Sequence, residues 1–146
     1  MSKPLDLSFE TTIHVRDHCM CLHVQRAARA LARRFDEALK PVGLTNQQFS
    51  LLMSLNRPEP PRMKEVALLL ALDRTTLTAN LKPLERRGLL TVIPDKADRR
   101  SRRLALTVEG RALLAEALPH WVRAEQEVER GIPDADSLRA GLKALC

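Results

Sequence analysis

The spacing of apolar residues predicts a long helix near the start of the chain. Between Ile13 and Leu39, apolar residues recur every three or four positions, as they do along one face of an amphipathic helix. This face consists of Cys21, Val24, Ala28, Leu31, Phe35 and Leu39. The segment 40–43 then contains a proline and a glycine, both of which break helices, so we expect the helix to end at Leu39.

A short helix and a stiff linker are expected next. Thr45 and Gln48 have the spacing of a capping box, which predicts a helix from Asn46 to about Leu55. The segment 57–61 contains three prolines, which exclude a helix there and restrict the backbone.

Two further helices, separated by a brief turn, are predicted after this linker. The first is expected over 63–70. Its apolar positions are Val66, Leu69 and Leu70. The second begins after Asp73, which is a good N-cap residue, and ends at Gly88. The apolar face of this second helix consists of Leu77, Leu81 and Leu84.

The pattern then changes to that of a β-hairpin. Residues 89–93 are largely apolar and rich in β-branched side chains, and residues 103–107 alternate between polar and apolar, as paired strands do. The polar and basic segment 94–102 is expected to form the tip between the two strands.

Apolar residues return to helical spacing after the hairpin. Thr107 is expected to cap a long helix, and a last short helix follows Pro133. The residues expected to line the buried side of the long helix are Leu114, Leu118, Trp121, Val122 and Val128. Those in register on the last helix are Leu138, Leu142 and Leu145. The apolar faces at the two ends of the chain must bury each other or those of a second subunit, or remain exposed.

The composition is that of a globular protein in a reducing compartment. A chain of 146 residues fits one domain, and 45% hydrophobic with 29% charged residues does not fit a disordered chain. Three cysteines are too few for a disulfide framework, so we expect a cytoplasmic protein. No long apolar run follows Met1, and we expect neither a signal peptide nor a membrane-spanning helix.

The positive charge is concentrated in one segment. The net charge is +6, and residues 86–103 contain seven Arg and Lys but only two Asp. A basic hairpin beside a helix is typical of a protein that contacts the phosphate backbone of nucleic acid. The two helices within 63–90 have the layout of a helix-turn-helix, whose second helix enters the DNA major groove.

The second of these helices, over 73–87, is predicted to contact DNA with the face opposite its leucines. Small hydroxyl side chains there allow close approach to base edges, and the cations suit phosphates. The predicted DNA-binding residues of the helix are Arg74, Thr75, Thr76, Thr78, Lys82 and Arg86. The hairpin tip, residues 95–102, can place its arginines in the minor groove.

Several motifs together resemble those of MarR-type transcriptional regulators. They are Leu44–Phe49, Leu72–Thr78, Leu84–Leu89, and Asp95–Arg100 followed by Leu106–Gly110. This resemblance covers roughly residues 15–128. It implies a mainly helical winged helix-turn-helix protein that acts as a homodimer on a pseudo-palindromic site in double-stranded DNA, usually as a repressor. It also implies a DNA-binding domain over 44–106 and a discontinuous helical dimerisation region formed by 1–43 and 107–146.

The resemblance also assigns roles within the hairpin, or wing. By motif position, it implies that Arg100 reaches the minor groove and that Asp98 holds the wing in shape, with Arg99 and Arg102 as further basic residues of the tip. The sequence departs from the family pattern at Ala97, where many members carry Arg. One ion pair between the wing and the body is therefore expected to be missing, with Arg102 and Arg103 as electrostatic compensation.

The first predicted helix begins with a group of His and Cys residues. On a continuous helix His14, His18 and Cys21 share a face, which offers at most three metal ligands from one chain, and we expect no metal site. Cys21 falls where peroxide-sensing members of the family have their reactive cysteine, but the tyrosines of that site are absent. Redox sensing, with Cys146 as a candidate partner of Cys19 or Cys21, therefore competes with a packing role for Cys21.

A small aromatic acid is the other candidate signal, because the family often binds an organic effector. Arg26 and Arg29 are candidate carboxylate partners, and Phe49, Met53 and Trp121 are candidate walls, although core packing explains these three equally well. The sequence has neither a Gly-rich phosphate loop nor a nucleophile elbow, and we expect no cofactor. A regulator is thus favoured over an enzyme and over a helical interaction module that does not bind DNA.

Overall fold

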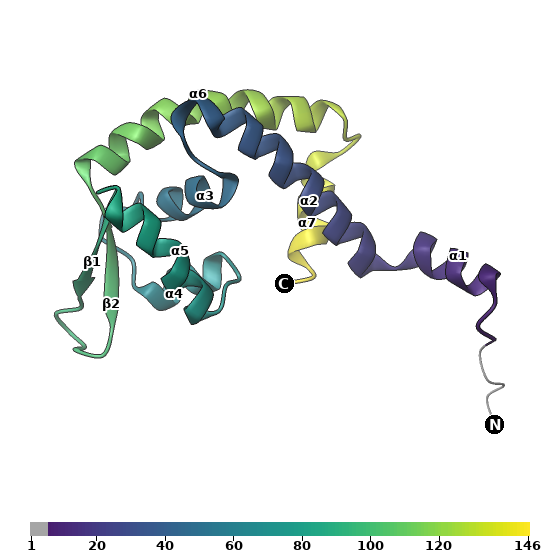
Figure 1. Cartoon of the computed structure of the whole chain (residues 1–146), viewed down its shortest axis with the longest axis horizontal. Helices are drawn as coiled ribbons and strands as arrows, with labels where there is room; N and C mark the ends of the chain where they lie inside the picture. The colour runs from purple at the N-terminus through teal and green to yellow at the C-terminus, as the bar shows by residue number, and fades with distance from the viewer. Residues whose placement is uncertain (1–5) are drawn as a thin grey trace. The chain divides into compact units, whose positions relative to one another are not determined.

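The computed structural model describes residues 6–146, which divide into two compact units (Figure 1). The first unit ends at Arg34 and the second runs from Phe35 to Cys146. The mainly helical class with one β-hairpin is confirmed. None of the helices within 6–146 combines the length and the apolar character needed to cross a bilayer. The expectation about a signal peptide rests partly on residues 1–5, which lie outside the described residues.

The prediction of a single long helix near the start of the chain is wrong. The structure has α1, Phe9–His18, and α2, Met20–Leu39, with Cys19 between them in an extended conformation at ψ 108°. The Cys19 amide still donates to the Val15 carbonyl at 2.8 Å and so closes α1. The Cys19 sulfur accepts from the Leu22 amide at 3.5 Å, in the manner of an N-cap for α2. Cysteine is not a usual cap, so the sequence pattern gave no sign of the break.

The end of α2 at Leu39 is confirmed. A 3₁₀ turn, η1, follows over Lys40–Val42, and Gly43 then adopts a left-handed conformation with φ 69°. A residue with a side chain is strained in this conformation, which explains the glycine.

The second unit contains the predicted helix-turn-helix and wing. Its elements are α3 Asn46–Ser54, α4 Met63–Leu69, α5 Arg74–Arg86, β1 Leu90–Pro94, β2 Arg102–Leu106, α6 Val108–Arg130 and α7 Ala135–Lys143. The capping box of Thr45 and Gln48 is confirmed, as are the caps Asp73 and Thr107. The two strands pair antiparallel, from Leu90 opposite Leu106 to Pro94 opposite Arg102.

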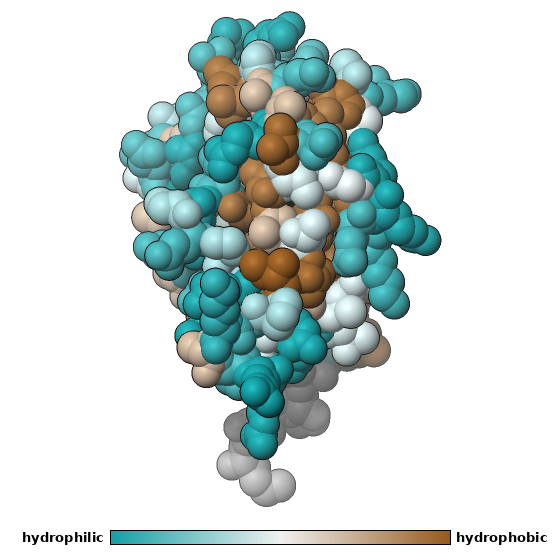
Figure 2. Space-filling view, turned by 90° about the vertical axis from the view of Figure 1, so that its left-hand side faces the viewer, coloured by the Kyte–Doolittle hydropathy of each residue, from teal (hydrophilic) through white to brown (hydrophobic). Residues whose placement is uncertain are grey.

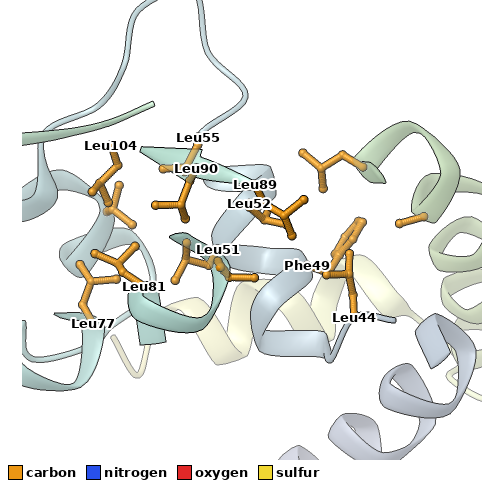
Figure 3. Packing of buried hydrophobic residues seen from close by; sticks show 14 of the residues in the cluster. Leu44, Phe49, Leu51, Leu52, Leu55, Leu77, Leu81, Leu89, Leu90 and Leu104 are labelled. Atoms are coloured by element: carbon orange, nitrogen blue, oxygen red, sulfur yellow. The ribbon is translucent and has the colours of Figure 1, made fainter. Parts of the chain in front are cut away.

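Leucine side chains form the core of this unit (Figure 3). Leu51 and Leu52 of α3 pack in one cluster with residues of α5 and of both strands. The α5 leucines in this cluster are Leu77, Leu81 and Leu84, whose predicted burial is confirmed. Burial of one leucine contributes about 1.5–3 kcal/mol, so this face fixes the rotation of α5 about its own axis. The opposite face of α5 is thereby left at the surface.

The start of α6 is held tightly against Gly88 and Leu89, just before β1, and these contacts explain Thr107 and Gly110 of the Leu106–Gly110 motif. The Thr107 hydroxyl donates to the Gly88 carbonyl at 2.6 Å and accepts from the Gly110 amide at 3.0 Å. A Cβ on Gly110 would overlap the Leu89 carbonyl oxygen, so only glycine fits at this position.

Several apolar side chains of the outer helices are exposed in the single chain. Leu118 and Val122 were expected on the buried side of α6, and this expectation is wrong for the chain taken alone, whereas Leu114 is buried. Leu69 of α4 is also exposed, while Val66 is fully buried. Near the end of the chain, the apolar side chains that remain exposed are Leu138 and Leu142 of α7 and Leu145, which follows that helix. None of the three belongs to the leucine core, and each is 40–59% exposed in the single chain.

Candidate nucleic-acid interface

The outward face of α5 carries the predicted base-reading side chains. Asp73 caps the helix, because its carboxylate accepts from the Thr76 amide at 2.7 Å. This bond and a second one from the Thr76 hydroxyl hold the pKa of the Asp73 carboxyl below its usual range. The predicted residues that are exposed on α5 are Arg74, Thr75, Thr76, Thr78, Lys82 and Arg86.

The three threonines differ in what their hydroxyl groups already bond. The Thr76 hydroxyl donates to Asp73 at 2.8 Å, and the Thr78 hydroxyl donates to the Arg74 carbonyl at 2.8 Å. The Thr75 hydroxyl has no hydrogen-bond partner within the described residues. Thr75 is therefore free to donate as well as to accept at a base edge, whereas Thr76 and Thr78 keep only acceptor capacity.

The wing presents its arginines from a tip that is closed by local hydrogen bonds. The Asp98 carboxylate accepts from the Arg100 amide at 2.9 Å, and the Ser101 amide donates to the Asp98 carbonyl at 3.0 Å. The Arg102 guanidinium donates to the carbonyls of Arg99 and Ser101. Arg99 and Arg100 are exposed and form no ion pair within residues 6–146, so both charges face solvent.

The wing and the helix-turn-helix enclose a basic groove of about 390 Å³. Its lining residues are Met63, Lys64, Ala67, Arg74, Asp98, Arg100, Ser101 and Arg102. Three residues predicted to bind DNA, Arg74, Arg100 and Arg102, thus meet in one place. Hydrophilic side chains surround the apolar patches on the face of the molecule that carries the wing (Figure 2). A groove lined by four cations and one acid is suited to the anionic backbone of DNA.

Sequence reasoning missed two residues of this region. Lys64 lines the groove from the first turn of α4, and a lysine at the start of the first helix of a helix-turn-helix was the available signal. Asp95 was counted only as an acid of the basic segment, yet its side chain is 3% exposed. It lies 3.0 Å from the guanidinium of Arg62 and 3.3 Å from that of Arg103. No sequence pattern connects residues 62 and 95.

The candidate effector residues fall into two groups. Phe49 and Trp121 stack at 6.2 Å between ring centroids, and Phe49 is buried in the leucine core, against which Trp121 and Met53 pack. Arg26 and Arg29 lie on α2 in the first unit. With His23, Ala27, Ala30 and Arg33 they line a surface depression of about 550 Å³. The first group has the role of core side chains, and the second offers several cations to an anion.

The cysteines are free thiols with different surroundings. Cys21 is exposed, so the prediction that it packs in a buried face is wrong for the single chain. The Gln25 side-chain amide donates to the Cys21 sulfur at 3.3 Å. Cys19 is half-buried at the junction of α1 and α2, and Cys146 is exposed at the end of the chain. Among residues 6–146, no three side chains of His, Cys, Asp or Glu lie close enough to share a metal ion.

The helix-turn-helix and most of the wing match a known protein family. The chain matches the model of the MarR family over residues 44–101. The HTH-type transcriptional regulator TtmR of Methylorubrum extorquens is 36% identical over 108 residues, which cover 73% of this chain and 55% of TtmR. The chain spans about half the length of curated relatives such as TtmR.

Two solved structures are similar over most of the chain. The transcriptional regulator MosR of M. tuberculosis, in complex with DNA, is 39% identical with a TM-score of 0.81, covering 88% of this chain and 93% of MosR. CouR from Rhodococcus jostii RHA1, bound to p-coumaroyl-CoA, is 27% identical with a TM-score of 0.76, covering 88% of this chain and 92% of CouR. Because the family model matches the helix-turn-helix and wing and MosR matches almost throughout, this chain belongs to the MarR family of winged helix-turn-helix transcriptional regulators.

Proposed function

We propose that this protein is a cytoplasmic repressor that binds a pseudo-palindromic site in double-stranded DNA as a homodimer. In this proposal α5 enters the major groove and the wing tip, residues 95–102, reaches the adjacent minor groove. The observation that carries the proposal is the basic groove, where Arg74 of α5 and Arg100 and Arg102 of the wing come together. The complex of the similar regulator MosR with DNA supports it.

The dimer is supported by apolar surface outside the leucine core. Six apolar side chains are exposed on α2, α6, α7 and the residues that follow α7: Leu31, Leu118, Val122, Leu138, Leu142 and Leu145. Exposed apolar faces of helices are usually buried against a partner. In a two-fold symmetric dimer, the partner is a second copy of the chain, and the same face is buried on both subunits. We therefore assign dimerisation to 1–43 and 107–146, and DNA binding to 44–106.

Fluorescence anisotropy with DNA from upstream of the protein's own gene tests the DNA-binding proposal. Site-specific binding should survive an excess of scrambled DNA and weaken steeply with salt, because bound cations are released from the DNA. Arg100→Ala should weaken binding by roughly tenfold, as expected for loss of one good contact of about 1.4 kcal/mol. Arg123→Ala is the matched control, since it removes the same charge from an exposed position on α6. Equal affinity for scrambled DNA would reject the proposal of a specific operator.

We further propose that an anionic aromatic effector releases the repressor from DNA. The cations of the α2 depression support an anionic ligand. The complex of CouR with p-coumaroyl-CoA shows that a similar regulator binds an aromatic ligand that carries phosphates. Titration of the protein–DNA complex with benzoate and with p-coumaroyl-CoA tests this idea, and Arg29→Ala should reduce the response. Release that is unaffected by Arg29→Ala would exclude this arginine as an effector ligand.

Oxidation of Cys21 is the alternative signal, favoured by its exposure and by the amide of Gln25 at its sulfur. A hydroperoxide would be reduced to an alcohol while the Cys21 thiolate becomes a sulfenic acid, which can condense with the Cys146 thiol and release water. Mass spectrometry and DNA binding after hydroperoxide treatment test this alternative. The Cys21→Ser variant should no longer respond; a response equal to that of the wild type would exclude Cys21 as the sensor.

A further inference from the structure

Asp95 connects the base of the wing to the rest of the second unit. It directly follows β1 and is the only buried charged side chain among residues 6–146. One carboxylate oxygen accepts from the Ala97 amide at 3.2 Å and from the Arg103 guanidinium at 3.3 Å. The other oxygen lies 3.0 Å from the Arg62 guanidinium. Asp95 thus joins both ends of the hairpin to a residue more than thirty positions earlier.

The segment that carries Arg62 is a stiff loop between α3 and α4. It contains three prolines, which restrict its backbone. The loop pairs with the outer edge of β2, since the Leu104 amide donates to the Pro61 carbonyl at 2.9 Å and the Arg103 guanidinium donates to the Pro60 carbonyl at 2.6 Å. Arg62 and Arg103 also form an isolated antiparallel bridge. An isolated two-stranded hairpin is marginal in water, so the wing needs support, which Leu90 and Leu104 gain from the leucine core and which this loop adds at the edge of β2.

We propose that Asp95 is a positioning residue for DNA binding, which acts by fixing the wing to the α3–α4 loop through Arg62 and Arg103. This inference rests on the proposed DNA-binding function. Asp95 is buried and negative, so it does not contact DNA phosphate itself. Its pairing with two guanidinium groups sets the direction of the hairpin, and hence the position of Arg100 relative to α5.

The Asp95→Asn variant distinguishes a positioning role of Asp95 from a direct effect of its negative charge on DNA affinity. Removal of one negative charge from a basic surface should by itself strengthen DNA binding. Loss of the wing's attachment should instead weaken binding, by roughly the tenfold expected for Arg100→Ala. Glu85→Gln is the matched control, because it neutralises an exposed acid of α5 that has no ion pair within the described residues. We expect Glu85→Gln to bind DNA equally well or more tightly, and Asp95→Asn to bind more weakly.

A double-mutant cycle with Arg100→Ala tests whether Asp95 acts through the wing. If it does, Arg100→Ala should cost little affinity in the Asp95→Asn background, because the wing is already misplaced. Independent, additive losses would overturn the proposal, as would unchanged or tighter binding by Asp95→Asn. If Asp95→Asn does not fold, the same double-mutant cycle is run with Arg62→Gln, since the Arg62 side chain is 45% exposed and its loss leaves Arg103 to pair with Asp95. Because this variant also removes a positive charge, non-additivity with Arg100→Ala supports the proposal and additive losses overturn it.

Limited trypsin digestion gives a readout that needs no DNA. The tip contains Arg99, Arg100 and Arg102, and cleavage there should be several-fold faster in Asp95→Asn than in the wild type at equal global stability. Unchanged cleavage would overturn the positioning role. If the wild type failed to bind DNA, the proposed function would be rejected, and the digestion would still decide whether Asp95 holds the wing.

Discussion

At the scale of single residues, the turn of the helix-turn-helix contains a strained alanine. Ala71 lies between α4 and α5 with φ 53°, in the left-handed region that favours glycine. Its amide donates to the Leu68 carbonyl at 3.2 Å, and the next amide donates to Ala67 at 2.9 Å. These bonds end α4 and direct the chain into α5. The angle between the two helices therefore requires the strained backbone conformation of Ala71.

Ala71→Gly should therefore stabilise the protein. The left-handed conformation costs a side-chain residue about 1–2 kcal/mol, and the extra entropy of glycine in the unfolded chain offsets about 0.5–1 kcal/mol of the gain. We expect the free energy of unfolding, measured by urea denaturation, to rise by about 0.5–1 kcal/mol. The matched control, Ala115→Gly, lies at an exposed helical position of α6 and should lower it by about 1 kcal/mol. A loss of stability in Ala71→Gly would mean that the turn is not strained.

Residue-level prediction from the sequence succeeded where the reason is local. Thr45, Asp73 and Thr107 cap helices because of side chains within three positions, and the pattern of the sequence contains that information. Asp95 was missed because its partners are determined by the path of the α3–α4 loop. The exposure of Cys21 was missed because the apolar spacing of α2 does not reveal which part of its face is covered.

At the scale of elements, the N-terminal cap of α5 depends on an ionised carboxylate. The pKa of Asp73 is below its usual range, because the Thr76 amide and then the Thr76 hydroxyl donate to the carboxylate. A carboxyl group whose pKa is lower in the folded than in the unfolded protein stabilises the fold above its unfolded pKa of about 3.9. That contribution is lost as the pH falls through the folded pKa. The N-terminus of α5 should thus weaken in acid.

Asp73→Asn should reduce the acid sensitivity of the protein. Asparagine caps a helix about as well as aspartate but does not titrate in this range, so the variant should resemble the wild type near pH 7. Between about pH 5 and pH 3 it should lose less of its free energy of unfolding than the wild type does. Other carboxyl groups titrate equally in both proteins, so the difference between the two urea series isolates Asp73. Parallel pH curves would show that this cap does not contribute through its charge.

The sequence predicted the helices and strands themselves, with one exception at Cys19. The β-hairpin and the helices of the second unit have bounds within a few residues of those expected, because proline, glycine and caps mark their ends. The break at Cys19 was not predictable, since the apolar spacing continues across it. It also changes the directions of His14 and His18 relative to Cys21, so the shared face expected on a continuous helix does not apply.

At the scale of the whole molecule, the second unit carries its basic groove and most of its exposed leucines on different elements. The basic groove lies between the wing and the helix-turn-helix, whereas the exposed leucines outside α4 lie on α6, on α7 and at Leu145. Arg139 of α7 pairs with Glu125 and Glu129 of α6, which holds the two helices together. Their apolar side chains are therefore presented on a fixed surface, as a self-complementary interface requires.

Leu142→Glu tests whether this apolar surface forms the dimer that DNA binding requires. Leu142 is 40% exposed in the single chain, and a buried carboxylate at a symmetric interface would be present twice, which opposes association. Sedimentation should show a dimer for the wild type and a monomer for the variant. Because a monomer contacts only one half-site, its affinity for the full DNA site should fall by about a hundredfold or more. Leu68→Glu, at an 83% exposed position on α4, is the matched control and should remain dimeric. A dimeric Leu142→Glu protein with unchanged DNA affinity would place the dimer interface elsewhere on the chain.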